Sequence, residues 1–173
     1  IPPVTGSRVM PAATMMAGGF ARATGEVGVA MTVPGPGASN ASTGIGDAYT
    51  DCQPVLLVTG GFERFMHHRD RSKLFHGLDQ ASFFRPIVRH YSCPQSAAQI
   101  PQAVRAAFAA IWEGRPGPAV LEIPPDVERS AAKGGLDLDR FKRLTGPLVP
   151  ARLPRSQRFW PSPDHIKALN AAP

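Results

Sequence analysis

The sequence predicts an α/β fold, a doubly wound parallel sheet with helices on both faces. Three segments, VGVAMTV (27–33), PVLLVTG (54–60) and GPAVLEIPPD (117–126), are almost wholly apolar over their central residues. Such unbroken runs are typical of strands that are buried on both faces, whereas a strand with one solvated face alternates apolar and polar residues. Helical segments lie between the runs, and this alternation of strands and helices favours parallel pairing.

The first helix is expected over residues 11–25. Pro11 suits the first turn of a helix, and Gly25 suits the position just past its end. Gly18 and Gly19 each cost about 1 kcal/mol in a helix interior relative to alanine. We therefore expect this helix to pack closely against another backbone at the glycine pair.

The remaining elements follow from composition and periodicity. VPGPGASN (33–40) contains two prolines and two glycines, so it is expected to form a turn that leads into a helix over residues 38–52. Residues 61–84 predict a polar loop that ends in a short helix, and RPIVRHYS (85–92) is the third strand in chain order. The clearest helix lies within residues 95–114, where apolar residues recur at helical spacing: Ile100, Val104, Ala107, Phe108, Ile111 and Trp112.

Composition indicates a globular chain, because 43% of the residues are hydrophobic and 18% are charged. Cys52 and Cys93 form no CxxC pair and have no histidine pair at zinc-finger spacing nearby, which argues against a disulfide framework or a structural metal. The start of the chain lacks a secretory signal, and no apolar run reaches the ~20 residues that a membrane span needs. The expectation is a cytoplasmic protein without a membrane segment.

The net charge of +6 arises in one stretch of the chain. Residues 129–158 hold eight basic and two acidic residues, whereas the two kinds balance in residues 1–128. A solvated linker explains this pattern, and a nucleic-acid-binding arm is the alternative. Such an arm would interleave aromatic residues for base stacking, and only Phe141, Phe159 and Trp160 are near. We favour the linker and expect no nucleic-acid partner.

The turn at 33–40 follows a predicted strand, and ligands of doubly wound sheets bind beyond the carboxyl ends of the strands. Its glycines allow a ligand to approach the backbone, the next helix offers its N-terminal amides, and Asn40 adds a donor and an acceptor. The segment is neither a Walker loop nor a GxGxxG fingerprint. A ligand-binding turn and a purely structural turn both stay open at this point.

Three motifs are more specific: GFARATG (19–25), GPGASN (35–40) and GRPGPAVLEIPPDV (114–127). In this order they resemble the thiamine-diphosphate enzymes of the acetolactate synthase type, a group of 2-oxo acid decarboxylases, pyruvate oxidases and carboligases. The resemblance runs from about residue 8 to residue 127 and corresponds to the N-terminal pyrimidine-binding domain of that family.

The resemblance also implies a domain organisation. Residues 1–128 would form the pyrimidine-binding domain without its first elements, residues 129–160 a basic linker, and residues 161–173 the start of a central domain. The chain looks truncated at both ends in comparison with the family.

In that family the cofactor lies between two subunits. By resemblance, Pro36, Gly37 and Asn40 line the pocket of the aminopyrimidine ring, and Gly61 lies near the cofactor. Mg²⁺ and the diphosphate would be held by a C-terminal domain of a second subunit, so a homo-oligomer is expected. Dependence on FAD stays open.

Two positions depart from the family pattern. Met10 stands where the family has a glutamate that hydrogen-bonds the pyrimidine, and a thioether cannot relay a proton, a contribution typically worth ~10²–10⁴ in rate. Glyoxylate carboligases also lack this glutamate. Gly61 stands where many relatives have glutamine. Glu26 and Glu63 are poor substitutes, because Glu26 opens a strand and Glu63 falls in a loop.

His76 and Asp79, in FHGLDQ, belong to a loop that approaches the active site in relatives, and they are candidates for substrate contact. His67 and His68 with Asp70 suggest a metal, but adjacent histidines on a polar loop are usually solvated. No metal ligand is assigned.

The predicted function is therefore the thiamine-diphosphate-binding domain of an acetolactate synthase-like carboligase or decarboxylase that acts on small 2-oxo acids. The chain alone is expected to show little or no activity. The alternative is a non-catalytic, degenerate paralogue, an interaction module that pairs with active subunits.

Overall fold

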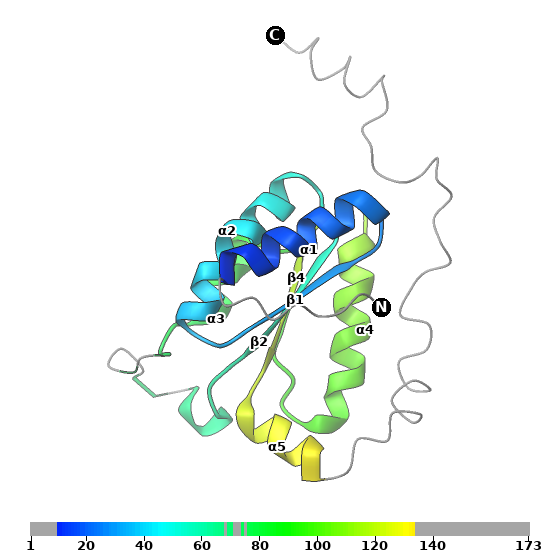
Figure 1. Ribbon diagram of the computed structural model, residues 1–173. Helices are drawn as coiled ribbons and strands as arrows, with labels where there is room; N and C mark the ends of the chain where they lie inside the picture. The colour runs from blue at the N-terminus through cyan, green and yellow to red at the C-terminus, as the bar shows by residue number, and fades with distance from the viewer. Residues whose placement is uncertain (1–9, 68, 71–73, 75, 134–173) are drawn as a thin grey trace, which may run out of the picture.

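The computed structural model describes residues 10–133, except 68, 71–73 and 75 (Figure 1). Most of the expected linker (129–160) and all of the expected central-domain start (161–173) lie outside the described residues.

A four-stranded sheet forms the centre of the described region (Figure 1). Its strands are β1 (Gly28–Thr32), β2 (Val55–Gly60), β3 (His90–Ser92) and β4 (Ala119–Ile123). They pair in the order β1-β2-β4-β3, and every pair is parallel. The predicted α/β fold with a parallel sheet is thereby confirmed.

Helices cover both faces of the sheet. On one face, α1 (Met10–Thr24), α2 (Pro36–Thr50) and the short α3 (Gln80–Phe84) enclose a core with the inward side chains of the strands. On the other face, α4 (Ile100–Trp112) packs on Leu56, Ala119 and Leu121. Successive strand residues point to opposite faces, so strands that are covered twice have to be apolar throughout. This explains the apolar runs of β2 and β4. The run at 27–33, expected to be buried on both faces, is covered on one face only, since Val29 and Met31 of β1 are 37% and 54% exposed and Ala30 between them is buried.

Two boundaries differ from the expectation. The segment 33–40 is a turn only in its first half, because α2 begins at Pro36. Proline is well tolerated at the first helical position, where its missing N–H has no intrahelical acceptor to lose. The strand expected over 85–92 is confined to β3, because Arg85–Ile87 form a 3₁₀ turn that includes Pro86.

The expected irregular stretch after residue 126 begins as a helix. Helix α5 spans Pro125–Lys133 and has Asp126 and Glu128 in its first turn. A proline at the start and acidic residues near the positive end of the helix dipole both favour a helix at this place. None of the helices in the described part of the chain is long and apolar enough to cross a membrane.

Helices α1 and α2 approach each other closely at Gly44. A Cβ atom at Gly44 would lie 2.8 Å from Cβ of Thr14 and 2.9 Å from the backbone nitrogen of Met15. Thr14 is buried and donates a hydrogen bond of 3.1 Å to the carbonyl of Ala41. The absence of a side chain at Gly44 thus lets the two helices touch.

The backbone contact expected at Gly18 and Gly19 is not found. A Cβ atom at Gly18 would meet the side-chain amide of Gln53, and one at Gly19 would meet no atom within 4 Å. The expectation that α1 packs closely against another backbone was right. The glycine that permits the contact is Gly44 of α2, however, and not Gly18 or Gly19.

We predict that Gly44→Ala destabilises the domain, because the added methyl group overpacks the α1–α2 contact at a cost of about 1–3 kcal/mol. Gly46→Ala is the matched control on the same helix, since a Cβ there meets nothing within 4 Å. It should stabilise the helix by up to about 1 kcal/mol. Denaturant unfolding followed by circular dichroism measures both, and equal effects of the two substitutions would contradict this account.

Candidate functional site

The three long strands end at one edge of the sheet, because parallel strands share their direction. β1 leads there into the turn before α2, and β2 leads into the loop that follows Gly60. Gly35 caps α2 with a φ of +62°, and its carbonyl accepts the first helical hydrogen bond from Ser39, at 2.8 Å. A residue with a Cβ atom is strained at this φ, so glycine suits the position.

His76 lies against this turn. Its Nδ1 donates a hydrogen bond to the carbonyl of Pro34 at 2.9 Å. A Cβ atom at Gly35 would lie 2.6 Å from Cα of His76, so the two backbones are in direct contact. His76, near the end of the 61–79 loop, therefore packs against the β1–α2 turn and helps to hold its conformation.

Gln80 links the same loop to the end of β2. Its amide nitrogen donates to the carbonyl of Gly60 at 2.9 Å, and its amide oxygen accepts from the hydroxyl of Thr59 at 3.2 Å. A Cβ atom at Gly60 would in turn lie 3.0 Å from Cδ of Pro34. The turn, the end of β2 and the start of α3 thus form one connected unit.

Gln80 was not among the predicted site residues, although it lies in the same FHGLDQ segment as His76 and Asp79. Asp79 has a visible structural role, since its carboxylate caps α3. It accepts from the backbone N–H of Ser82 at 3.2 Å and from the Ser82 hydroxyl at 2.7 Å.

The cofactor-binding candidates on α2 occupy its first turns. Pro36 is the first helical residue and is exposed, Gly37 is buried, and Asn40 is exposed one turn further on. Pro36 and Asn40 are four residues apart and so lie on one face of the helix. Met10 is the first residue of α1, and its side chain lies outside the described atoms.

Gly61 faces a buried carboxylate. A Cβ atom at Gly61 would meet Oε1 of Glu122, which is only 6% exposed, and the Tyr91 hydroxyl donates a hydrogen bond to Oε2 of the same side chain. Burial and the charge of Glu122 raise the pKa of Tyr91 well above its ordinary value. The same two causes raise the pKa of the Cys93 thiol to about 12.

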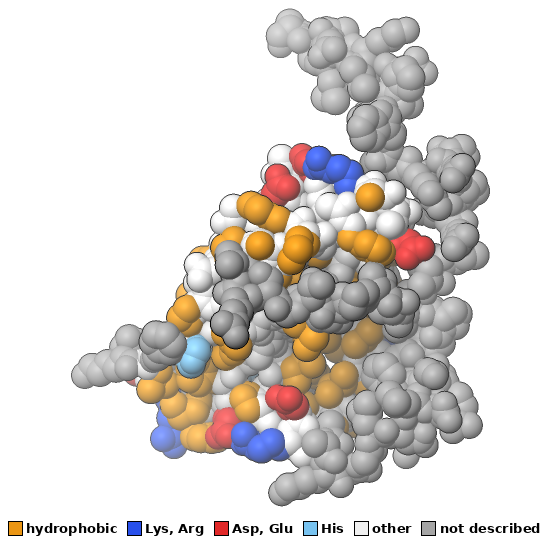
Figure 2. Space-filling model, viewed as in Figure 1, with side chains coloured by type: hydrophobic (Ala, Val, Ile, Leu, Met, Phe, Trp, Pro, Cys, Tyr) orange, Lys and Arg blue, Asp and Glu red, His pale blue; other side chains and the backbone are white. Residues whose placement is uncertain are grey.

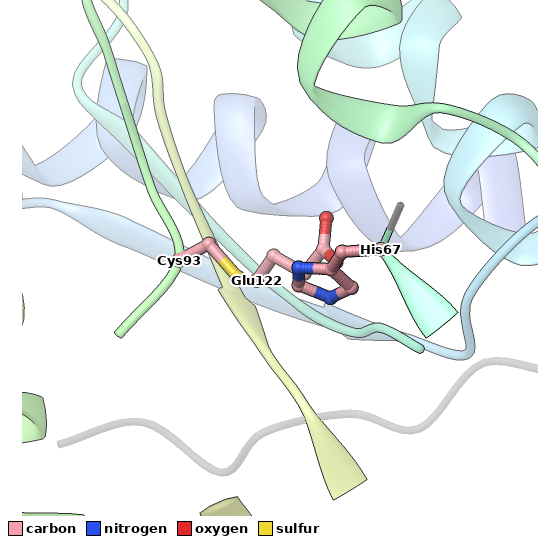
Figure 3. A group of neighbouring side chains, drawn as sticks. All are labelled: His67, Cys93 and Glu122. Carbon is pink, nitrogen blue, oxygen red and sulfur yellow. The ribbon is translucent and has the colours of Figure 1, made fainter. Parts of the chain in front are cut away.

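His67, Cys93 and Glu122 come together beside this carboxylate (Figure 3). One ligand atom of each lies within 4.8 Å of those of the other two. The expectation that His67 is solvated is not met, because its side chain is half-buried and its Nε2 donates to the carbonyl of Phe62 at 3.0 Å. His68 lies outside the described residues, and Asp70 is exposed.

Neither Glu26 nor Glu63 is placed to substitute for the glutamate that Met10 replaces. Glu26 is exposed and precedes β1, at the opposite edge of the sheet. Glu63 pairs with Arg129 of α5, and Arg64 likewise pairs with Asp126 at 2.6 Å. The second pair lowers the pKa of Asp126, chiefly through the side-chain hydrogen bond from Arg64.

We predict that Gly35→Ala is more destabilising than Gly114→Ala. Both glycines have a φ close to +65°, which a residue with a Cβ atom rarely adopts. The ψ of Gly35 is −112°, outside the left-handed helical region, where the strain is about 1–2 kcal/mol, so alanine is poorly tolerated there on backbone grounds as well. Only Gly35 also touches a backbone, since the nearest atom to a Cβ at Gly114 is a side-chain nitrogen of Arg89 at 4.0 Å. Denaturant unfolding of the two variants measures the difference, and equal losses would contradict this account.

Comparisons with known proteins agree with this architecture. The family model described as "Thiamine pyrophosphate enzyme, N-terminal TPP binding domain" matches residues 4–83. The chain is 38% identical over 130 residues to a probable acetolactate synthase large subunit of Methanocaldococcus jannaschii. The aligned part makes up 75% of this chain and 21% of the relative. It is 41% identical over 122 residues to the acetolactate synthase isozyme 3 large subunit of Escherichia coli, covering 70% of this chain and 21% of the relative.

A plant relative gives the same result. Acetolactate synthase 2, chloroplastic, of Nicotiana tabacum is 35% identical over 137 residues, covering 79% of this chain and 20% of the relative. The chain thus spans about a fifth of the length of the relatives that it matches. It belongs to the thiamine-diphosphate enzymes, as an N-terminal domain of the acetolactate synthase type.

Proposed function

We propose that the β1–α2 turn of this chain binds the aminopyrimidine ring of thiamine diphosphate. The observation that carries the proposal is the start of α2 at Pro36, which places Pro36 and Asn40 on one helix face at the carboxyl edge of the sheet. The Asn40 amide offers both a donor and an acceptor to an aminopyrimidine, and the Pro36 ring offers an apolar surface. Gly37 between them lets the ligand approach the backbone.

The rigidity of the turn supports this assignment. His76 bonds to the carbonyl of Pro34 and contacts Gly35, and Gly60, which is bonded to Gln80, packs against Pro34. A binding turn that is already ordered loses little conformational entropy when the ligand arrives.

The whole protein would act on 2-oxo acids as a carboligase or decarboxylase. When thiamine diphosphate is bound, its thiazolium supplies the carbanion chemistry, and the protein supplies binding and orientation. In this proposal a diphosphate-binding domain of a second subunit holds Mg²⁺ and the diphosphate.

Exposed apolar side chains support pairing with a second subunit. Met15 and Met16 of α1 are about half exposed, at 49% and 47%, and Figure 2 shows apolar side chains gathered over α1. Val29 and Met31 of β1 are also exposed, at 37% and 54%, on the opposite side of the strand from Ala30, which is buried against α1 and α2. Apolar surface of this kind is characteristic of a protein interface.

A non-catalytic interaction module is the second candidate, and the surroundings of Gly61 favour it. A side chain at position 61 would collide with the Glu122 carboxylate, so no polar group can be presented to a cofactor from there without moving Glu122. Met10 likewise offers no carboxyl group. With Met10 and Gly61, this chain lacks two polar side chains that could transfer protons to or from the cofactor.

Magnetic resonance titration of the isotope-labelled chain with thiamine diphosphate and Mg²⁺ tests the binding proposal. We expect weak binding, with a Kd of about 1 mM or more, because this chain would contact only the pyrimidine end. The amide signals of residues 35–40 and 60–61 should shift, and those of α4 should not. Inorganic diphosphate is the control ligand and should leave these signals in place. An unchanged spectrum with saturating thiamine diphosphate would refute the proposal.

Asn40→Ala should weaken this binding about two- to tenfold, the usual effect of one lost hydrogen bond. Asp47→Ala is the control, since Asp47 is also exposed on α2 but lies two turns nearer its carboxyl end. Equal affinities of the two variants would remove Asn40 from the site.

Met10→Glu separates the two candidate functions. If the ring binds as in the catalytic relatives, a carboxyl group at position 10 should tighten thiamine binding by roughly tenfold or more, the effect of a hydrogen bond to a charged group. The same titration measures this change. Unaltered affinity would favour the non-catalytic module.

A further inference from the structure

We propose that His67, Cys93 and Glu122 form a binding site for one divalent transition-metal ion of the Zn²⁺ class (Figure 3). The three residues come from separate parts of the chain: the loop after β2, the residue that follows β3, and β4. The site goes beyond the proposed thiamine function, and none of the family resemblances assigns it.

The spacing of the ligand atoms suits a tetrahedral ion after a small adjustment. In Zn²⁺ sites the bonds to sulfur, nitrogen and oxygen are about 2.0–2.3 Å long, so neighbouring ligand atoms lie roughly 3.3–3.8 Å apart. The three atoms here already lie within 4.8 Å of one another. Closing the site requires each side chain to move by less than about 1 Å.

The His67 ring is held in the tautomer that a metal requires. Its Nε2–H donates to the carbonyl of Phe62 at 3.0 Å, which leaves Nδ1 as the unprotonated nitrogen of a neutral ring. Metal-binding histidines characteristically donate their other ring N–H to a backbone carbonyl or a carboxylate in this way. The bond to Phe62 therefore orients the ligand.

Glu122 has the same kind of outer support. The Tyr91 hydroxyl donates to Oε2 of Glu122, and Oε1 lies on the side of Gly61. Ligating carboxylates are typically hydrogen-bonded by a second residue. Glycine at position 61 leaves the space that the carboxylate occupies, because any side chain there would displace it.

Two ion pairs hold the histidine loop near the sheet. Glu63 pairs with Arg129, and Arg64 pairs with Asp126 at 2.6 Å, so the loop after β2 is tied at two points to α5. Helix α5 directly follows β4, the strand that carries Glu122. The loop is thus fixed to the same part of the fold as the carboxylate.

The donor set selects the class of metal. A thiolate, an imidazole and one carboxylate suit Zn²⁺ and its tetrahedral analogue Co²⁺, whereas Mg²⁺ and Ca²⁺ require oxygen ligands. The thiol of Cys93 must lose its proton when the ion binds, as coordinated thiols do. Three protein ligands leave the fourth position to a water molecule.

Titration of the reduced chain with Co²⁺ tests the site. We expect saturable binding of one equivalent, with a thiolate-to-cobalt charge-transfer band in the near ultraviolet and the intense visible bands of a four-coordinate ion. Zn²⁺ should displace the cobalt and should raise the melting temperature of the chain, since it binds only the folded form. Failure to bind Co²⁺ saturably would overturn the proposal.

Three variants and one control establish the ligands. Cys93→Ser should abolish the charge-transfer band, and His67→Ala and Glu122→Gln should each weaken Co²⁺ binding by at least about tenfold. Cys52→Ser is the control, since this cysteine lies at the opposite end of the domain, where Arg115 donates to its sulfur at 2.8 Å. Circular dichroism checks that each variant is folded.

A band that survives in Cys93→Ser, or that disappears in Cys52→Ser, would exclude the site. Unchanged affinity in His67→Ala would exclude the three-ligand set. If a ligand variant unfolds, the wild-type band and its displacement by Zn²⁺ still decide whether a thiolate site exists. No thiamine compound takes part in these measurements, so their outcome is independent of the proposed cofactor binding.

Discussion

The pairing of β2 with both β1 and β4 is the constraint on which the rest of the domain depends. β2 is the central strand of this parallel set, and its register with β1 and β4 brings their carboxyl ends to one edge. At this edge Gly60 meets Pro34 and Gln80, and the next residue, Gly61, meets Glu122. A slip of β2 by one residue would turn its inward side chains to the opposite face and separate all of these contacts.

The adjacent residues Gly60 and Gly61 face two different groups of side chains at this edge. On the α2 side, Pro34 closes over Gly60, and the turn is ordered by hydrogen bonds among neutral groups. On the β4 side, Gly61 leaves room for a buried carboxylate, which meets a phenol, a thiol and an imidazole. Burial of titratable groups is costly unless they are paired or bound to a cation. Glu122 is paired with Tyr91, and the thiol and the imidazole beside it supply the other donors of the proposed metal site.

The order of elements and the location of the α2 turn could be predicted from the sequence, because both depend on local signals. Apolar runs reveal the strands, of which β2 and β4 are covered on both faces and β1 on one, and a helical period reveals α4. The start of α2 was harder to predict, since proline is compatible with both a turn and a first helical residue. The hydrogen bond from the Ser39 N–H to the Gly35 carbonyl shows that Pro36 already belongs to the helix. Gly18 and Gly44 show the same limit. A glycine within a helix indicates a close contact, but the sequence does not tell which residue of another element makes that contact.

The His67–Cys93–Glu122 group lay beyond such reasoning, because its members belong to three elements that only the sheet topology brings together. His67 resembled a solvated loop residue, Cys93 followed a short edge strand, and Glu122 interrupted an otherwise apolar strand. That interruption was the available signal. A carboxylate in a strand covered on both faces has to find a partner inside the protein. The parallel register pairs Ser92 with Leu121, so it would place Tyr91 and Cys93 near Glu122, whereas His67 comes from a loop that the strand pattern does not locate.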